Sequence, residues 1–589
     1  MIIVKPIALP ELSFRTICFA LIVSMLFAAP VGLSSLQAQE NRTLDGSGNN
    51  PLLSSQGAAN TALIRCCYEA EYPDGFGDQI VFPGAPNARS VSNLFGSQSE
   101  VVYNRRGLSD WVVQWGQFLA HDMGLTPTNA ANNVLIDGSV GNFDIPILDS
   151  GDPLGPNPIR FNRSDFRSGT GLPGPPIDIA REQSNAVSAY LDGSTVYGVD
   201  SVRGDELRTF SGGRLETTAG GILPGKNDAG LPNNDPFGAG SQLFLAGDVR
   251  ANENIGLLAT HSLFVQEHNR LAGLIAAQDP TLNDEDIYQL ARKIVGAEIQ
   301  AITYNEFLPA ILGDNAPSDN DYEYNQFING STTTAFSTAA FRIGHSMQSS
   351  SILLVDDDGV QVDEVSVRDA FFNPSFFDDN PDNVELVLNG LATQLSQEND
   401  NLIVDDLRSF LFAPGAGGTD LLAFDIQRGR DHGLPDYNEL RTGYGLELLT
   451  DFSELTSDED LQQLLEDIYG DIDSIDAFVG LLAEDHLAGA SVGELTAAVI
   501  AQQFIRTRDG DRLFWINDPG LQTSLVSSII DLENFTLSDL IRANTGLENI
   551  QDNAFFATQV IPEPSTGGIL LGATLVLMLR RRKRERSKA

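Results

Sequence analysis

The stretch Trp115-Gly116-Gln117-Phe118-Leu119-Ala120-His121-Asp122 decides how the rest of the sequence is interpreted. It lies within an apolar periodicity over 109–123 that predicts a helix. Gln117 and His121 are four residues apart and share one helix face, while Asp122 is turned about 100° away from His121. A Gln and a His are costly in an otherwise apolar helix unless they line a polar cavity. We expect both to face a cavity; a hydrogen-bonded core histidine is the alternative.

A second histidine lies in Phe341-Arg342-Ile343-Gly344-His345-Ser346, within a helix-like stretch that begins near Thr333. The chain has only six histidines, so each one carries weight. A histidine in this setting could bind iron through a ring nitrogen. Arg342, almost one turn earlier, could pair with an acidic group of a cofactor. Alone, this segment is a weak indication of function.

A third group of polar residues suggests a cation site. In Ser188-Ala189-Tyr190-Leu191-Asp192-Gly193-Ser194, oxygen-bearing side chains occur at every second position, with a glycine near the end. Hard cations such as calcium prefer oxygen ligands. Asp122 could complete the site, and the cation would then tether the helix of Gln117 and His121 from behind. A simple turn is the alternative.

Composition indicates an acidic globular protein that does not bind nucleic acid. The 589 residues include 80 acidic and 36 basic ones, a formal charge of −44, whereas binding the nucleic-acid backbone needs a basic surface. Hydrophobic residues make up 42% and charged residues 20%, which is typical of a folded chain. The three cysteines, Cys18, Cys66 and Cys67, exclude a disulfide framework.

Helical periodicity recurs along the chain, and strand patterns are scarce. We expect helices over 252–277, 284–312, within 458–482 and over 492–507, and the best strand over 351–355. The expected fold is therefore mainly α-helical, a single large domain with few short strands and long loops. A domain of this size exceeds what one core usually supports, so a cofactor at its centre would fit.

Residues 1–38 are typical of a secretory signal peptide. Lys5 and Arg15 precede an apolar run over 17–30, and small residues follow up to Ala38. The run is short for a membrane span, which is the alternative. We therefore expect the protein to be exported.

Residues 560–589 look like a bacterial PEP-CTERM sorting signal. Pro562-Glu563-Pro564 precedes a short apolar stretch over 566–579 and then a basic cluster that begins at Arg580. The apolar stretch is short for a stable span, and a basic cluster stays in the cytoplasm. The resemblance implies exosortase-type sorting machinery as a partner, removal of the tail and only transient membrane contact. The product would be extracellular, or attached to the cell surface or matrix of a bacterium; a permanent anchor is the alternative.

Between these ends, over residues 39–559, the sequence resembles the animal-type haem peroxidases of the peroxidase–cyclooxygenase superfamily. The W-G-Q-x-L-x-H-D pattern at 115–122 carries the resemblance, together with further stretches in the family's order. These further stretches are 42–46, 291–298, 304–309, 427–435 and 508–512. Several motifs in one order are far more specific than any motif alone.

The resemblance implies catalytic residues on both sides of a haem. His345 is then the proximal ligand of the haem iron, and His121 the distal base that takes a proton from hydrogen peroxide and returns it to the leaving oxygen. Arg250 is the distal arginine, whose charge stabilises the charge that develops as the O–O bond breaks. Gln117 matches a glutamine that forms hydrogen bonds beside the distal water or halide.

The same resemblance implies haem b and Ca²⁺ as cofactors. Arg342 matches an arginine near a haem propionate. The calcium site is matched by Asp122, Ser188, Tyr190 (through its carbonyl), Asp192 and Ser194. The other four histidines, His261, His268, His432 and His486, are expected to be structural.

Two departures from the family pattern concern the distal side. Some members bind haem through two ester bonds, from an Asp and a Glu. Here the Asp position is Ala120, so we expect at most one ester link, through Glu253. The Met that forms a sulfonium bond in the strongest chloride oxidiser is replaced by Asn254, which favours bromide, iodide or thiocyanate over chloride as the donor.

Two further departures concern the proximal side and the cysteines. The Asn that bonds the proximal histidine in many members is Asp425 here, and a carboxylate partner would lower the iron potential. The family's extracellular disulfides are missing. Gly48 stands where a Cys is common, and adjacent Cys66 and Cys67 are not expected to form an ordinary bridge.

We therefore expect a secreted haem peroxidase, an oxidoreductase that oxidises halides, pseudohalides or aromatic donors. Its purpose could be defence, peroxide removal in response to oxidative stress, or matrix cross-linking. A fatty-acid dioxygenase is one alternative, but it needs a radical-forming Tyr where this chain has Arg342. An extracellular matrix or adhesion protein on a peroxidase scaffold is another. Such a scaffold would not need His121, Arg250 and His345 together.

Overall fold

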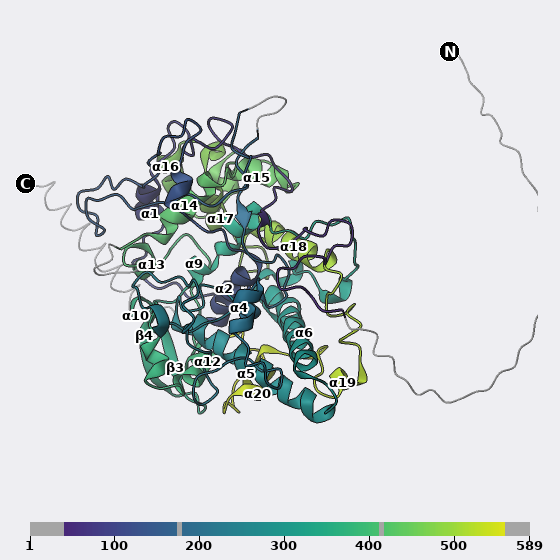
Figure 1. The fold of residues 1–589 in the computed structure, drawn as a ribbon. Coiled ribbons are helices and arrows are strands. Elements are labelled where there is room, and N and C mark those ends of the chain that lie inside the picture. The colour runs from purple at the N-terminus through teal and green to yellow at the C-terminus, as the bar shows by residue number, and fades with distance from the viewer. Residues whose placement is uncertain (1–39, 174–178, 412–417, 560–589) are drawn as a thin grey trace, which may run out of the picture. The chain divides into compact units, whose positions relative to one another are not determined.

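The computed structural model describes residues 40–173, 179–411 and 418–559 (Figure 1). The chain divides after Glu40, and the description below concerns the unit that begins at Asn41. The predicted signal peptide 1–38 and the predicted sorting signal 560–589 lie outside the described residues. In the part of the chain that is described, no helix is both long and apolar enough to cross a membrane.

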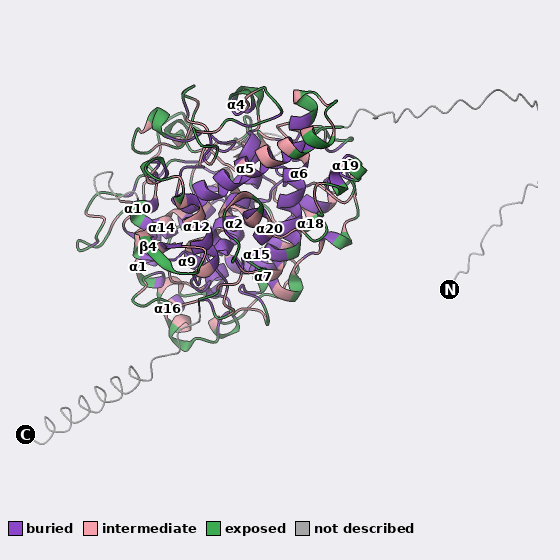
Figure 2. Ribbon diagram, turned by 90° about the horizontal axis from the view of Figure 1, so that it is seen from below, coloured by how far each residue is buried: buried purple, intermediate pink, exposed green. Residues whose placement is uncertain are grey.

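Three long helices form the centre of this unit: α2 (Trp111–Met123), α5 (Ile255–Gln278) and α6 (Asp284–Ile302). α5 packs against both α2 and α6. Most side chains of α5 are buried (Figure 2), as expected for a helix at the core of a large domain. The Asn254 side chain caps α5, and Asn283 forms a capping box with Asp286 at the acidic first turn of α6. The predicted helices 109–123 and 252–277 are thus confirmed to within a few residues.

Two predicted helical stretches are broken. The stretch 284–312 is α-helical only to Ile302; a π-helical turn, η3 (Thr303–Phe307), and then α7 (Leu308–Leu312) follow. Pro309 has no amide hydrogen, so a regular α-helical ladder cannot continue through it unchanged. The stretch after Thr333 divides into α8 (Thr334–Thr338), the 3-10 turn η6 (Ala340–Arg342) and α9 (Gly344–Met347).

The described strands form two small antiparallel sheets. β1 (Thr61–Ala62) pairs with β2 (Ser184–Asn185), and β3 (Ser351–Val355) pairs with β4 (Gln361–Ser366), with Ser351 opposite Ser366. β3 is mostly buried and packs on α12 (Asn383–Thr393). The predicted strand 351–355 and the mainly α-helical fold class are therefore confirmed.

The other helices cover this core. They are α1 (Ala88–Phe95), α3 (Ser194–Tyr197), α4 (Ser201–Glu206), α10 (Val367–Ala370), α11 (Ser375–Asp378), α13 (Asp405–Arg408), α14 (Leu421–Asp431), α15 (Tyr437–Gly443), α16 (Glu459–Tyr469), α17 (Ala477–Ala483), α18 (Glu494–Asp509), α19 (Ser524–Ser527) and α20 (Leu537–Asn544). α1, α14, α15, α16 and α17 gather at the top of Figure 1, where α14 packs against α1 and α17. α14 also contacts α8, which brings it to the site described below.

The cysteines depart from expectation. Cys66 and Cys67 form a disulfide between adjacent residues, although their Cα atoms are only 3.8 Å apart, less than in ordinary bridges. Both sulfurs lie beside the Gln502 side-chain oxygen, at 3.1 and 3.5 Å, in a bend of the chain at 66–68. The prediction that the two would not form an ordinary bridge failed to foresee this tight local ring.

Candidate functional site

A cavity of about 600 Å³ lies between α2 on one side and the α8–α9 segment on the other. Its lining is largely apolar, with a few converging polar groups, as is typical of ligand sites. Six residues predicted from the sequence line it, namely Gln117, His121, Arg250, Glu253, Arg342 and His345. Segments that are far apart in the sequence therefore meet around one space.

On the α9 wall, His345 is held by a buried carboxylate of α14. His345 Nδ1 lies 2.6 Å from Asp425 Oδ2, and Arg342 Nη1 donates to Asp425 Oδ1. Burial alone raises the pKa of Asp425, but the charges of His345 and Arg342 outweigh it and hold this pKa below its usual value. An ionised Asp425 accepts the Nδ1 proton, so the Nε2 lone pair of His345 is the one left for a metal.

On the α2 wall, His121 is a neutral imidazole without a close partner for its Nδ1 atom. Among the described residues, His121 Nδ1 has no hydrogen bond, and the closest carboxylate oxygen, Asp248 Oδ1, is 3.8 Å away. Burial, and after it the charge of Arg250, lowers the pKa of His121 well below its usual value. His121 is therefore a base that is free to accept a proton at neutral pH.

Arg250 is fixed beside His121 by Asp248, which our reading of the sequence gave no role. Arg250 Nε and Nη2 donate to the two carboxylate oxygens of Asp248, at 2.8 and 2.7 Å. Arg250 Nη2 also donates to the carbonyls of His121 and Gly124. Asp248 stands only two residues before Arg250, a short spacing that could have pointed to this pair.

Gln117 and Glu253 form a second polar pair in the same wall. Gln117 Nε2 donates to Glu253 Oε2 at 3.1 Å, and Asn254 Nδ2 donates to Gln117 Oε1 at 2.9 Å. Glu253 Oε2 also lies 3.7 Å from His121 Nε2. Burial raises the pKa of the Glu253 carboxyl. Ala120 lines the cavity as well, but it has no carboxyl group.

Behind α2, the predicted calcium ligands come together at the start of α3. Asp122 Oδ1 accepts from Ser194 Oγ at 2.9 Å, and Ser188 Oγ donates to Asp192 Oδ2 at 2.8 Å. Tyr190 lies in the same buried turn. Burial, together with the charge of Asp192, raises the pKa of Asp122 to about 7. Two buried carboxylates that disfavour each other's charge fit a divalent cation, which would neutralise both.

Two hydrogen bonds of the Thr195 backbone join this turn to Asp248, the partner of Arg250. Thr195 N donates to Asp122 Oδ1 at 2.9 Å, and the Thr195 carbonyl accepts from Asp248 N at 2.9 Å. Asp248 in turn holds Arg250. This turn therefore connects Asp122 on α2 to the loop that carries Arg250.

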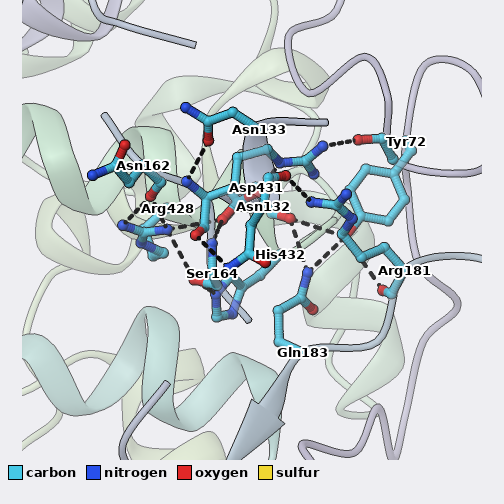
Figure 3. A network of polar contacts seen from close by, with 12 residues as sticks. Tyr72, Asn132, Asn133, Asn162, Ser164, Arg181, Gln183, Arg428, Asp431 and His432 are labelled. Carbon is cyan, nitrogen blue, oxygen red and sulfur yellow. Dashed lines mark hydrogen bonds and ion pairs between the residues drawn. The ribbon is translucent and has the colours of Figure 1, made fainter. Parts of the chain in front are cut away.

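Figure 3 shows a polar network that sequence reasoning missed, and several of its residues line the cavity. Arg428 of α14 donates to Asp431 Oδ2 and Ser164 Oγ, each at 2.8 Å, and it also lines the cavity. His432, expected to be structural, lines the cavity too. Its Nε2 lies 2.8 Å from Ser164 Oγ, and its Nδ1 lies 2.9 Å from Thr338 Oγ1. Arg428 follows Asp425 by three residues on α14, a helical spacing that could have identified it.

His261, His268 and His486 lie outside the cavity lining. His261 and His268 are buried in α5, and His486 lies 2.6 Å from the Asn399 carbonyl through its Nε2, outside the cavity lining. The lining includes Phe341 and Arg342 but, among the described residues, no tyrosine. The radical-forming Tyr of a dioxygenase therefore has no counterpart here.

The donor set fits a haem. One wall offers a histidine with a free Nε2 atom, and the other offers a neutral histidine and an arginine. Arg342 and Arg428 also line the cavity and are cationic groups of the kind that bind carboxylates. The size, the two histidines and the arginines together are what a planar, iron-containing, dianionic group requires.

Comparisons with known proteins agree with this geometry. A family profile described as animal haem peroxidase matches residues 41–555. Peroxinectin A of Dictyostelium discoideum is 33% identical over 552 residues, which cover 91% of this chain and 99% of that protein. The solved structure of peroxidase A from the same organism superposes with a TM-score of 0.78 at 32% identity and covers 88% of this chain and 100% of that one. A fatty acid α-dioxygenase of Arabidopsis thaliana superposes with a TM-score of 0.72 over 89% of this chain and 85% of its own. At 21% identity it shows a shared fold alone.

Proposed function

The chain belongs to the animal haem peroxidase family and is a haem-dependent oxidoreductase, and from that premise we propose that it uses hydrogen peroxide to oxidise small donors. The proposed donors are bromide, iodide and thiocyanate, or aromatic molecules. The observation that carries the proposal is a carboxylate-bound His345 on one side of the cavity and, on the other, a neutral His121 whose Nδ1 atom has no hydrogen bond among the described residues.

In this proposal, the two walls of the cavity have different roles toward haem. His345 would hold the iron through Nε2, while Arg342 and Arg428 would bind the two propionates. When bound, haem supplies the redox chemistry, passing two electrons to peroxide and recovering them from the donor. Asp425 fixes the orientation and tautomer of His345, and its negative charge increases the electron density of the imidazole.

His121 and Arg250 would handle the proton and the charge of peroxide. His121 would take a proton from one oxygen of hydrogen peroxide and return it to the other oxygen, which leaves as water. Arg250 presents a permanent positive charge to the O–O bond as it polarises. Asp248 holds Arg250 in place, and Gln117 is held between Glu253 and Asn254, so this wall is ordered before peroxide arrives.

Calcium and a covalent link complete the proposed cofactor chemistry. Ca²⁺ would be bound by Asp122, Ser188, Asp192 and Ser194 with the Tyr190 carbonyl. Ala120 cannot form an ester, so the link to haem is at most one, through Glu253. Organic solvent should extract all haem from acid-denatured Glu253→Gln but not from the wild type. Equal extraction would contradict the link.

The proposed destination follows from the two ends of the chain. A leader over 1–38 would direct export, and the tail over 560–589 would be recognised by an exosortase and removed, leaving an extracellular or surface-bound bacterial protein. Mass spectrometry of the secreted protein checks both cleavages; an intact tail on a protein that stays membrane-bound would favour the permanent anchor.

The test of the proposed function is the absorption spectrum of the haem-loaded protein before and after one equivalent of peroxide. We expect a Soret band that bleaches and shifts with peroxide and recovers on addition of bromide or iodide. A folded, calcium-loaded protein without a Soret band would overturn the enzyme proposal. The matrix or adhesion role would then become the leading account. Oxygen uptake with a fatty acid would instead revive the dioxygenase alternative.

A further inference from the structure

The mouth of the cavity is defined by three of its lining residues. Thr128, Arg160 and Asn162 are exposed, whereas the rest of the lining is buried or partly buried. All three belong to two neighbouring loop segments, which are joined by the bridge between Thr128 and Ser164. Molecules that enter from solvent therefore pass these two loops, and Arg160 is the one charged residue among the three.

Arg160 differs from the other arginines of the cavity because it has no acidic partner. Arg250 is paired with Asp248, Arg342 with Asp425 and Arg428 with Asp431. Within the described residues, the Arg160 guanidinium makes neither an ion pair nor a hydrogen bond. Its positive charge is thus the least compensated one along the lining.

The backbone on both sides of Arg160 is fixed. Ile159 and Ile145 exchange two backbone hydrogen bonds of 2.9 Å, and Phe161 N donates to Asp144 Oδ1 at 2.9 Å. Ile159 and Phe161 are buried, so the intervening Arg160 is presented outward at the mouth. The backbone of Arg160 is therefore held in place, whereas its guanidinium has no partner among the described residues.

The rest of the molecule is strongly acidic, with a formal charge of −44 on the full chain. Such a surface repels small anions at long range, and a local positive charge at the cavity mouth weakens that repulsion where entry occurs. We propose that Arg160 is the specificity-determining residue of this entrance and that it favours anionic donors such as iodide and thiocyanate over neutral ones. The proposal rests on the proposed peroxidase function and names the class of donor that its site favours.

The test compares Arg160→Gln and Arg160→Glu with the wild type, all haem-loaded. The measurement is the second-order rate constant of donor oxidation for iodide and for an uncharged phenol, at several ionic strengths. We expect the iodide rate to fall about tenfold in Arg160→Gln and further in Arg160→Glu, with the phenol rate unchanged. Salt screens both the long-range repulsion of the acidic surface and the local attraction of Arg160, so the slope of the iodide rate against ionic strength should be lowest in the wild type and highest in Arg160→Glu.

Arg167→Gln is the matched control. Arg167 is an exposed arginine that lies outside the cavity lining and faces Glu182 at 3.8 Å, so it changes net charge equally without changing the mouth. The iodide rate of this control should stay at the wild-type value. Equal losses in Arg160→Gln and Arg167→Gln would show that only net charge matters and would overturn the proposal.

Two further outcomes separate this inference from the ones it rests on. If neither donor is oxidised by the wild type, the proposed function fails before Arg160 is tested. If the phenol is oxidised normally but iodide rates and salt slopes are the same in all variants, only the inference about Arg160 fails. A lower haem content of Arg160→Gln, measured from the Soret band per protein, would instead assign Arg160 to haem binding and overturn the entrance role.

Discussion

The two histidines of the cavity are the same residue in opposite settings. His345 Nδ1 lies 2.6 Å from a buried carboxylate that belongs to a neighbouring helix. His121 Nδ1 has no hydrogen bond within the described residues. The Asp248 carboxylate, 3.8 Å away, already accepts hydrogen bonds from Nε and Nη2 of Arg250. The pKa of His121 is lowered well below its usual value by burial and by Arg250.

This difference shows how a carboxylate at two distances yields two functions from one side chain. A close partner fixes the tautomer and increases the electron density of a ligand. A partner held away by an arginine leaves the imidazole neutral and able to exchange protons. The site is thus specified as much by Asp425 and Asp248 as by the histidines.

Removing each imidazole should separate the two functions most strongly. His121→Ala should keep haem but react with peroxide at least about 10³-fold more slowly, because both proton transfer and local polarity are lost. His345→Ala should lose haem, because no other described histidine lies on that wall with a free nitrogen. Stopped-flow absorption with peroxide and haem content per protein measure the two effects.

His486→Gln is the control for this pair, since His486 lies outside the cavity lining. It should retain both haem and the wild-type peroxide rate. A His121→Ala variant that reacts with peroxide at the wild-type rate would remove His121 from its role. Full haem retention by His345→Ala would do the same for His345.

Calcium removal tests whether the geometry of the α2 wall depends on the turn at the start of α3. We expect peroxidase turnover to be abolished, because loss of the cation leaves Asp122 and Asp192 repelling each other and loosens the Thr195 link to Asp248 and Arg250. Turnover should be measured after chelation, with metal content verified, and again after calcium is restored. We expect the haem absorption to survive calcium removal, because His345 lies on the other wall. Undiminished turnover in a calcium-free protein would refute the link.

Many of the helices and site residues could be predicted from the sequence, but the contacts between distant residues and some local breaks could not. The helices of His121 and of Glu267-His268 follow from local periodicity and capping, which are properties of neighbouring residues. The break of 284–312 at η3 and the bridge between Cys66 and Cys67 depend on local geometry that periodicity does not encode. The pairing of Arg342 with Asp425 joins residues 83 positions apart, and only the folded chain shows it.

Substitution of Asp248 tests the comparison of the two histidines more specifically, and its expected effect on the peroxide rate is smaller than that of His121→Ala. Asp248→Asn should slow the peroxide reaction about 10- to 100-fold, because Arg250 loses its fixed position while His121 stays in place. Haem content should be unchanged. Asp279→Asn, at a half-buried residue that follows α5 and lies outside the cavity lining, is the control and should have no effect.

The pH profile distinguishes a positioning role of Asp248 from general damage. A base with a lowered pKa stays unprotonated as pH falls, so the wild-type peroxide rate should be flat through about pH 6.5, where a free imidazole titrates. The negative charge of Asp248 raises the pKa of His121, whereas the charge of Arg250 lowers it. If Arg250 stays beside His121 through its bonds to the carbonyls of His121 and Gly124, Asp248→Asn should move the acid limb to lower pH. An acid limb that shifts upward would show that Arg250 has left His121.

Asp425→Asn should have the smallest effect on turnover and the most specific one on the metal. An amide can still accept the His345 proton through its oxygen, so haem should be retained and the peroxide rate should change only a few-fold. The neutral partner gives the imidazole less anionic character, so the midpoint potential of the iron should rise relative to the wild type. Spectroelectrochemical titration measures this potential, and an unchanged value would count against the carboxylate's role.

Arg342→Lys is the companion variant, because Asp425 also binds Arg342. This substitution weakens the ion pair but leaves the carboxylate in place. The potential should therefore stay closer to the wild-type value than in Asp425→Asn. A potential that moves equally in both variants would mean that the ion pair, and not the bond to His345, sets the iron's redox balance.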